Sequence, residues 1–311
     1  MKKGTPKTIV VAVDTSSSGR SMFKEALVLA SSIRARVVAV SVTPEYEGNM
    51  NRFFIKNSER QLDEPFTKTL REAAEYASSL GLKMATCHRH GKPCDEIVAV
   101  AREENAGLIV LGSSKRLQLE RMLSGRTIEE IIVQGPCDVL LIPDGSEIRF
   151  NKIVVGLEDS MAAVEAGNRA FEVALSYGSE VHAVYAVDIP AEKALRYGVS
   201  KDAEKKAAEV IQSYCCKGKE LGLQVFTEMV WSTAEKSITE YAKKRDISLI
   251  IISSKSEEGL LDMFSGSIVE RIASMAACPI LVTQTKKDKN GELFVSFFPD
   301  VSDRIIRVTE N

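Results

Sequence analysis

The sequence contains two copies of one pattern, and this repeat restricts the fold more than any other feature. Thr8–Asp14 (TIVVAVD) resembles Lys152–Glu158 (KIVVGLE), which lies 144 residues further on. Leu108–Ser114 resembles Leu249–Lys255 at a shift of 141 residues. A period this long is typical of duplicated domains, because solenoid repeats are only ~20–45 residues long. The 311 residues therefore predict two domains of one fold, each near the usual domain size of ~150 residues.

Each copy alternates short apolar runs with patterns of helical spacing. Ile9–Val13 is a continuous apolar run, which favours a strand buried on both faces of a parallel sheet. Met22, Ala26, Leu29 and Ile33 then recur at helical spacing. Similar runs predict strands near 9–13, 37–42, 82–88, 108–111 and 139–142, and near 153–157, 181–187, 223–230, 249–252 and 280–283. This alternation predicts an α/β fold with a doubly wound five-stranded parallel sheet in each half.

Three capping boxes predict where helices begin. Thr127 with Glu130 has the spacing for the fourth helix of the first half, and Ser232 with Glu235 and Ser267 with Glu270 have it for helices of the second half.

The turn at Asp144-Gly145-Ser146 predicts the domain boundary, with one domain over residues 1–145 and another over 146–285. Segment 44–62 is a polar excursion found only in the first half, so we expect a surface loop or a partner contact there.

The C-terminal tail, residues 286–311, lies outside the repeat. Glu292–Phe298 and Arg304–Val308 are strand-like and are separated by a turn signal at Pro299-Asp300. The tail is therefore expected to be β-rich, as an antiparallel pair added to a sheet edge or to a neighbouring chain. A partly ordered tail is the equal alternative.

Composition excludes several classes of protein. Lys and Arg number 41 against 43 Asp and Glu, so a basic footprint for nucleic acid is not expected. The six cysteines form no C-x-x-C pair and suit buried thiols in a reducing compartment. No apolar run reaches the ~18 residues of a membrane-spanning helix. The apolar stretch after the basic N-terminus stops at Asp14, too early for a secretion signal. We therefore expect a cytoplasmic protein.

A ligand site is expected at the carboxyl ends of the first and fourth strands. Ligands bind doubly wound sheets beyond strand ends, where the strand order reverses. Asp14 and a Ser-rich turn through Gly19 follow the first strand, Gly112–Lys115 follows the fourth, and Ser124–Thr127 opens the next helix. Small residues let backbone N–H groups approach an anion, and an acid can accept from a ribose or a base. The alternative is that Gly and Ser are simply common in strand–helix turns.

At these residues the chain resembles the universal stress protein family, in its tandem two-domain form. The likeness covers about residues 7–143 and 151–284. It is carried by the first strand ending in Asp14, by the Gly-x-Pro helix entry in Gly91–Ile97, and by the strand-four Gly112 followed later by a glycine and a helix.

The resemblance implies a strand order of 3-2-1-4-5 in each sheet, a fold like that of the adenine nucleotide alpha hydrolases, and dimer formation. The dimer would be a homodimer or an internal pseudo-dimer of the two halves. In many members the resemblance also implies ATP or AMP binding, with magnesium where the nucleotide is ATP. The contacting positions carried over by the resemblance are Asp14, Val42, Gly112 and Gly125 in the first half, and Glu158, Gly266 and Ser267 in the second. Thr127 is a further candidate because it lies where the fourth helix opens.

Both halves depart from the family's nucleotide pattern, Gly-x2-Gly-x9-Gly-(Ser/Thr). In the first half Lys115 replaces the second Gly and Arg126 replaces the Ser/Thr. These two cations would block the phosphates, neutralise them, or remain solvated loop charges. In the second half Ser253 and Ser256 replace both earlier glycines, and Glu158 stands at the Asp position. The first half is therefore the better candidate for a nucleotide site.

Cys87, His88, His90 and Cys94 form a Cys/His cluster of the residue types that bind zinc. His88 and His90 share one strand face while Cys87 points to the other, and the spacing matches no common zinc module. We therefore predict strand-end packing and no metal ligands.

The sequence contains no P-loop, no dinucleotide fingerprint, no zincin motif and no nucleophile elbow, so no catalytic residues are expected. The interpretation is a stress-response binding and regulatory module that responds through an unidentified protein partner. Two alternatives remain, a slow ATP hydrolase that uses Asp14, and an interaction protein with degenerate pockets.

Overall fold

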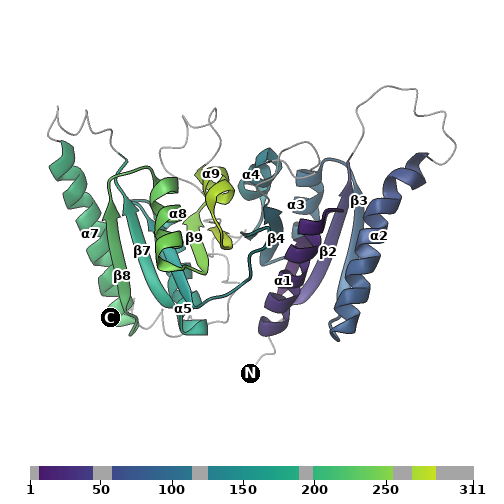
Figure 1. Cartoon of the computed structure of the whole chain (residues 1–311), viewed down its shortest axis with the longest axis horizontal. Helices are drawn as coiled ribbons and strands as arrows, with labels where there is room; N and C mark the ends of the chain where they lie inside the picture. The colour runs from purple at the N-terminus through teal and green to yellow at the C-terminus, as the bar shows by residue number, and fades with distance from the viewer. Residues whose placement is uncertain (1–6, 45–57, 114–124, 189–198, 255–267, 285–311) are drawn as a thin grey trace. The chain divides into compact units, whose positions relative to one another are not determined.

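The computed structural model describes residues 7–44, 58–113, 125–188, 199–254 and 268–284, and its chain forms two compact units, Met1–Ser146 and Glu147–Asn311 (Figure 1). The predicted tail, 286–311, lies outside the described residues, as does most of the polar excursion at 44–62. The end of that excursion is helical, because α2 begins at Ser58.

The first unit is a five-stranded parallel sheet with the order β3-β2-β1-β4-β5. This order and the parallel pairing confirm the doubly wound fold expected from the sequence. The elements are β1 (Thr8–Ala12), α1 (Ser17–Ile33), β2 (Arg36–Thr43), α2 (Ser58–Ser79), β3 (Met84–His90), α3 (Pro93–Glu103), β4 (Leu108–Ser113), α4 (Gly125–Gln134) and β5 (Asp138–Pro143).

The second unit repeats the same order as β8-β7-β6-β9-β10, again with parallel pairing. The tandem fold is therefore confirmed in both halves. Its elements are β6 (Lys152–Leu157), α5 (Met161–Tyr177), β7 (Glu180–Ala186), α7 (Val199–Glu220), β8 (Val225–Val230), α8 (Ala234–Arg245), β9 (Leu249–Ser253), α9 (Ile268–Met275) and β10 (Ile280–Thr283).

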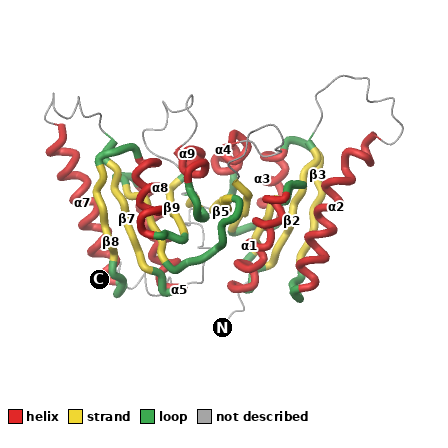
Figure 2. Tube along the Cα trace, viewed as in Figure 1, coloured by secondary structure: helices red, strands yellow, loops and turns green. Residues whose placement is uncertain are grey.

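The central strands form the core of each unit because helices cover both of their faces. In the first unit α1 packs against α2, and α3 packs against α4, with the strands between the two pairs (Figure 2). Every residue of β1 is buried, as the continuous apolar run predicts. The edge strand β3 has no fully buried residue, in keeping with its weaker, alternating pattern.

Two predicted helix starts are wrong by one or two residues. Helix α4 begins at Gly125, so Thr127 lies inside its first turn and cannot be the N-cap. Helix α8 has Thr233 as its N-cap in place of Ser232. Serine caps two other helices, Ser16 for α1 and Ser160 for α5. The side chain of each accepts a hydrogen bond from a backbone N–H of the first turn.

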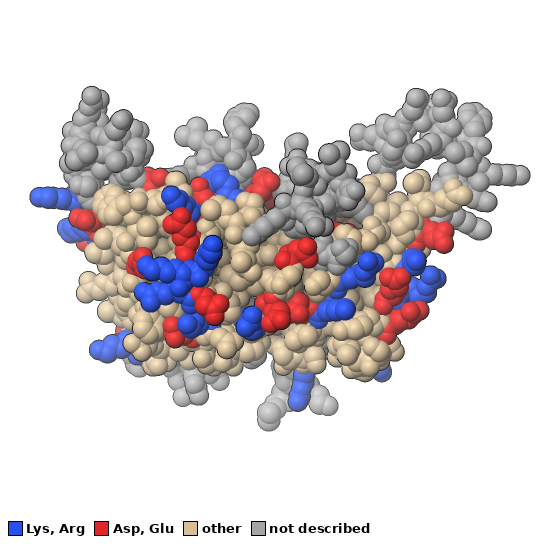
Figure 3. Space-filling view, in the orientation of Figure 1, with Lys and Arg blue, Asp and Glu red and all other residues tan. Residues whose placement is uncertain are grey.

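Charges of both signs are interspersed over the face drawn in Figure 3, without a continuous basic stripe on the residues coloured there. This distribution agrees with a net charge of −2 and gives no footprint for a polyanion on that face. Among the described helices, none combines the length and the apolar character needed to cross a bilayer.

Candidate functional site

The candidate site lies where the strand order reverses in the first unit. Strand β1 pairs with β2 on one side and with β4 on the other, for example Ile9 with Leu108. The chain leaves β1 toward α1 and leaves β4 toward α4, and these helices belong to different packed pairs. Such a point opens a crevice at the carboxyl ends of the strands, where Asp14 and Gly112 stand.

Asp14 is held at the start of α1 by a closed set of hydrogen bonds. Its Oδ1 accepts from the backbone N of Ser16 at 3.0 Å and from the Ser16 hydroxyl at 2.5 Å. The same hydroxyl accepts from the backbone N of Gly19 at 3.0 Å, which makes Ser16 the N-cap of the helix. A carboxylate fixed beside a helix N-terminus is stabilised by the positive end of the helix dipole. The acid is therefore oriented before any ligand arrives.

Gly19 makes room for this carboxylate. A Cβ atom placed on Gly19 would lie only 2.1 Å from Oδ1 of Asp14, far inside van der Waals contact. Any side chain at position 19 therefore has to displace the carboxylate of Asp14.

The end of β4 carries an unsatisfied hydroxyl. Ser113 is 7% exposed, and among the described residues its Oγ finds no hydrogen-bond partner. Buried polar atoms are nearly always paired, so an orphan of this kind needs a water, an ion or a ligand. One residue earlier, Gly112 faces Met22 of α1, and a Cβ there would be 3.9 Å away, an ordinary contact. Among the described residues, there is therefore room for a further atom beside Gly112.

Val42 lies in β2 with 3% of its surface exposed, so its side chain belongs to the core. Only a small edge of it, or its backbone, is available to a ligand. Its neighbour Ser41 donates to the backbone oxygen of Val13 at 2.8 Å and ties the ends of β1 and β2 together.

The phosphate side of the expected site is described only in part. Lys115, Gly266 and Ser267 lie outside the described residues. Gly125 and Arg126 form the first residues of α4, and Thr127 follows them within its first turn. The predicted helix N-terminus is therefore present, while the relation of Lys115 to Asp14 stays a prediction.

The second unit repeats the acid–serine arrangement, with a glutamate in place of the aspartate. The Ser160 hydroxyl donates to Oε1 of Glu158 at 2.6 Å and accepts from the backbone N of Ala163 at 3.1 Å. Ala163 stands 144 residues after Gly19, so the second unit has a Cβ where the first unit has none. Its acid, Glu158, is one methylene longer than Asp14.

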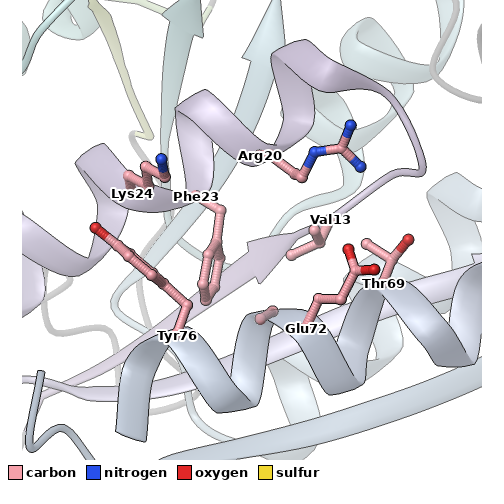
Figure 4. A pocket seen from close by; sticks show the side chains of 8 residues that line it. Val13, Arg20, Phe23, Lys24, Thr69, Glu72 and Tyr76 are labelled. Carbon is pink, nitrogen blue, oxygen red and sulfur yellow. The ribbon is translucent and has the colours of Figure 1, made fainter. Parts of the chain in front are cut away.

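A cavity of about 160 Å³ lies between α1 and α2, next to the end of β1 (Figure 4). Arg20 and Lys24 project from α1, and Glu72 and Tyr76 from α2, while Val13 forms its inner end. Its volume is below the ~300 Å³ at which pockets for small molecules begin. This cavity is too small to hold a nucleotide, and we assign none to it.

The sequence analysis included the turn through Gly19 and the segment Gly112–Lys115 in the expected site, but it did not single out Ser16, Gly19 and Ser113. A signal for Ser16 was available, since Ser160 repeats it at the shift of 144 residues. The orphaned hydroxyl of Ser113 depends on burial and on the positions of its neighbours, which no local pattern reveals.

Comparisons with known proteins agree with this architecture. A family model described as the Universal stress protein family matches residues 5–143 and again 149–284. A universal stress protein of Methanocaldococcus jannaschii is 29% identical over 153 residues, which cover 47% of this chain and 89% of the relative. Another from Bacillus subtilis is 22% identical over 147 residues, which cover 43% of this chain and 99% of that relative. The crystal structure of a universal stress protein from Archaeoglobus fulgidus matches with a TM-score of 0.68 at 18% identity, over 89% of this chain and 96% of that one, which supports the fold.

Proposed function

Because the chain belongs to the universal stress protein family, with a family domain in each half, we propose that it is a stress-response binding and regulatory protein whose first unit binds an adenine nucleotide. The observation that carries this proposal is the Asp14 carboxylate, fixed by Ser16 at the start of α1 beside the reversal of strand order. The unsatisfied Ser113 hydroxyl at the end of the neighbouring strand supports it.

In the proposed complex each part of the nucleotide meets a different group. Asp14 accepts a hydrogen bond from the ribose or the base, and the backbone near Val42 borders the adenine. The phosphates lie at the N-terminus of α4, where Gly125 and Thr127 offer backbone N–H groups and a positive helix end. Arg126, together with Lys115 from the preceding segment, supplies countercharge, and magnesium accompanies the phosphates where the nucleotide is ATP.

We assign the nucleotide to the first unit rather than the second. The second unit has Glu158 and Ala163 where the first has Asp14 and Gly19, so its acid reaches the helix start with a longer side chain. Gly266 and Ser267 remain the candidate phosphate positions there. The difference favours one nucleotide per chain.

The proposed mechanism is a shift in population. A nucleotide that bridges the ends of β1 and β4 stabilises one arrangement of residues 112–127 and so changes the surface offered to a partner protein. The protein would act in the cytoplasm, and a homodimer remains part of the proposal. No step of this mechanism needs turnover of the nucleotide.

The test is to purify the full chain, release small molecules with acid, and measure binding of ATP and AMP by calorimetry. We expect about one adenine nucleotide per chain, lost in Asp14→Ala and kept in the matched variant Glu158→Ala. Equal binding by the two variants would remove Asp14 from the site. Absence of binding by the parent chain would overturn the proposal, and steady release of phosphate from ATP that Asp14→Ala abolishes would favour the hydrolase alternative.

A further inference from the structure

A second polar cluster lies at the carboxyl end of the edge strand β3, apart from the Asp14 network. It contains His88 and His90 on one face of that strand and Asp63 on α2, the helix that packs against β2 and β3 (Figure 1). One ligand atom from each of the three lies within 4.8 Å of the others. The sequence pairs the two histidines but gives no hint of Asp63, which is 25 residues upstream of His88.

The distances between the donor atoms are close to those of a metal site. Nε2 of His90 is 2.8 Å from Oδ1 of Asp63, and Nε2 of His88 is 3.8 Å from the same oxygen. A tetrahedral zinc ion with ligands at about 2.0–2.1 Å places its ligand atoms about 3.3 Å apart. Shifts of well under 1 Å would therefore let both Nε2–Oδ1 separations match a metal ion between these groups.

We propose that Asp63, His88 and His90 form a binding site for one divalent transition-metal ion of the zinc class. Two imidazole nitrogens and one carboxylate are a donor set that such ions prefer, and three protein ligands leave a further position for water. The Thr43 hydroxyl donates to Oδ1 of Asp63 at 2.9 Å and lies 2.8 Å from Nε2 of His88, so a bound ion takes the place of the contact between Thr43 and that nitrogen.

The cluster is accessible from solvent. The His90 side chain is 58% exposed, while those of His88 and Asp63 are half-buried. An ion can therefore reach the three donor atoms without a rearrangement of the core.

The duplicated unit shows that the fold does not require these side chains. At a shift of 141 residues, Met229 and Trp231 stand in the positions of His88 and His90, and Glu204 in that of Asp63. The second unit forms the same edge strand with the same register between β7 and β8. The fold of this edge strand therefore requires neither histidine, which is consistent with a ligand that only the first unit binds.

The direct test uses the untagged full chain, which has only three histidines. We expect one equivalent of zinc to shift the imidazole NMR signals of His88 and His90 while those of His182 stay in place, because His182 is buried in the second unit. Cobalt in place of zinc should give a spectrum without thiolate-to-metal absorption, since Cys87 points to the opposite face of β3. Unmoved His88 and His90 signals, or strong thiolate absorption, would overturn the proposal.

Variants give a second, independent readout by zinc titration against a chromophoric chelator. Asp63→Asn and His90→Gln alter half-buried or exposed side chains and should fold, and each should lose at least about tenfold in affinity, since even outer-shell partners contribute ~10–100-fold. Glu204→Asn, the matched change in the second unit, should leave the affinity unchanged. Full affinity in both first-unit variants would refute the site. No nucleotide enters these experiments, so their outcome is independent of the proposed function.

Discussion

Replacing Gly19 by alanine tests whether the start of α1 is shaped around the Asp14 carboxylate. The added Cβ would lie 2.1 Å from Oδ1, and ordinary contact begins at 3.4 Å, so the carboxylate has to move by about 1.3 Å. A movement of that size breaks the hydrogen bonds of 3.0 and 2.5 Å from Ser16.

Two opposing effects set the magnitude for stability. Loss of hydrogen bonds to a charged group costs ~1.5–3 kcal/mol, while Gly to Ala inside a helix gains ~0.5–1 kcal/mol. We therefore expect Gly19→Ala to lower the free energy of unfolding by about 0.5–2.5 kcal/mol. Under the proposed function, nucleotide affinity also falls by about 10–150-fold, because the acid no longer faces the ligand in its fixed position.

The assay is urea unfolding of the full chain together with calorimetric titration of ATP and AMP. The matched control is Ala163→Gly in the second unit, which should cost only the helix propensity of ~0.5–1 kcal/mol and leave nucleotide binding intact. If Gly19→Ala instead raises the free energy of unfolding by the full helix-propensity difference and leaves nucleotide binding unchanged, then the glycine is not needed to make room for Asp14 and this reasoning is wrong.

Three further predictions concern the rest of the described structure. Phe171, fully buried and stacked on Tyr214 at 4.4 Å between ring centroids, should lose ~3–5 kcal/mol of stability as Phe171→Ala, against under ~1 kcal/mol for the exposed Phe226→Ala, both measured by urea unfolding. Burial lowers the pKa of His182, so the unfolded chain binds its proton more readily; stability should fall as pH drops from about 7 to about 5, and by less in His182→Gln. Ser113→Ala should leave thermal stability unchanged or raise it, because the hydroxyl is unpaired among the described residues, while weakening nucleotide binding in the same titration.

Apolar runs predicted most of the fold because parallel strands covered on both faces require them. The run Ile9–Val13 overlaps β1, and the internal repeat transferred each assignment in the first half to the second. Helix starts were less predictable, because several neighbouring Ser and Thr residues compete to cap one helix. Thr233 rather than Ser232 is the N-cap of α8, and its side chain makes no capping hydrogen bond.

The candidate sites were predictable only where their residues are neighbours in the sequence. Asp14 follows its strand directly, and His88 and His90 share a strand face by simple alternation. Asp63 joins the histidines because α2 packs across β2 and β3, which is a tertiary contact that no local pattern encodes. The sequence therefore indicated the two histidines of the cluster but not its carboxylate. Without that carboxylate, strand-end packing was the prediction for the histidines.

The two units differ at several residues on which the proposals for the first unit depend. Gly19, His88 and His90 are replaced at the repeat shifts by Ala163, Met229 and Trp231, while strand order and the serine N-cap are retained. Trp231 is 44% exposed, so this replacement did not simply fill the core. The fold persists while these strand-end residues change, so the fold does not require them. Each equivalent position of the second unit is therefore a matched control for the ligand sites proposed in the first.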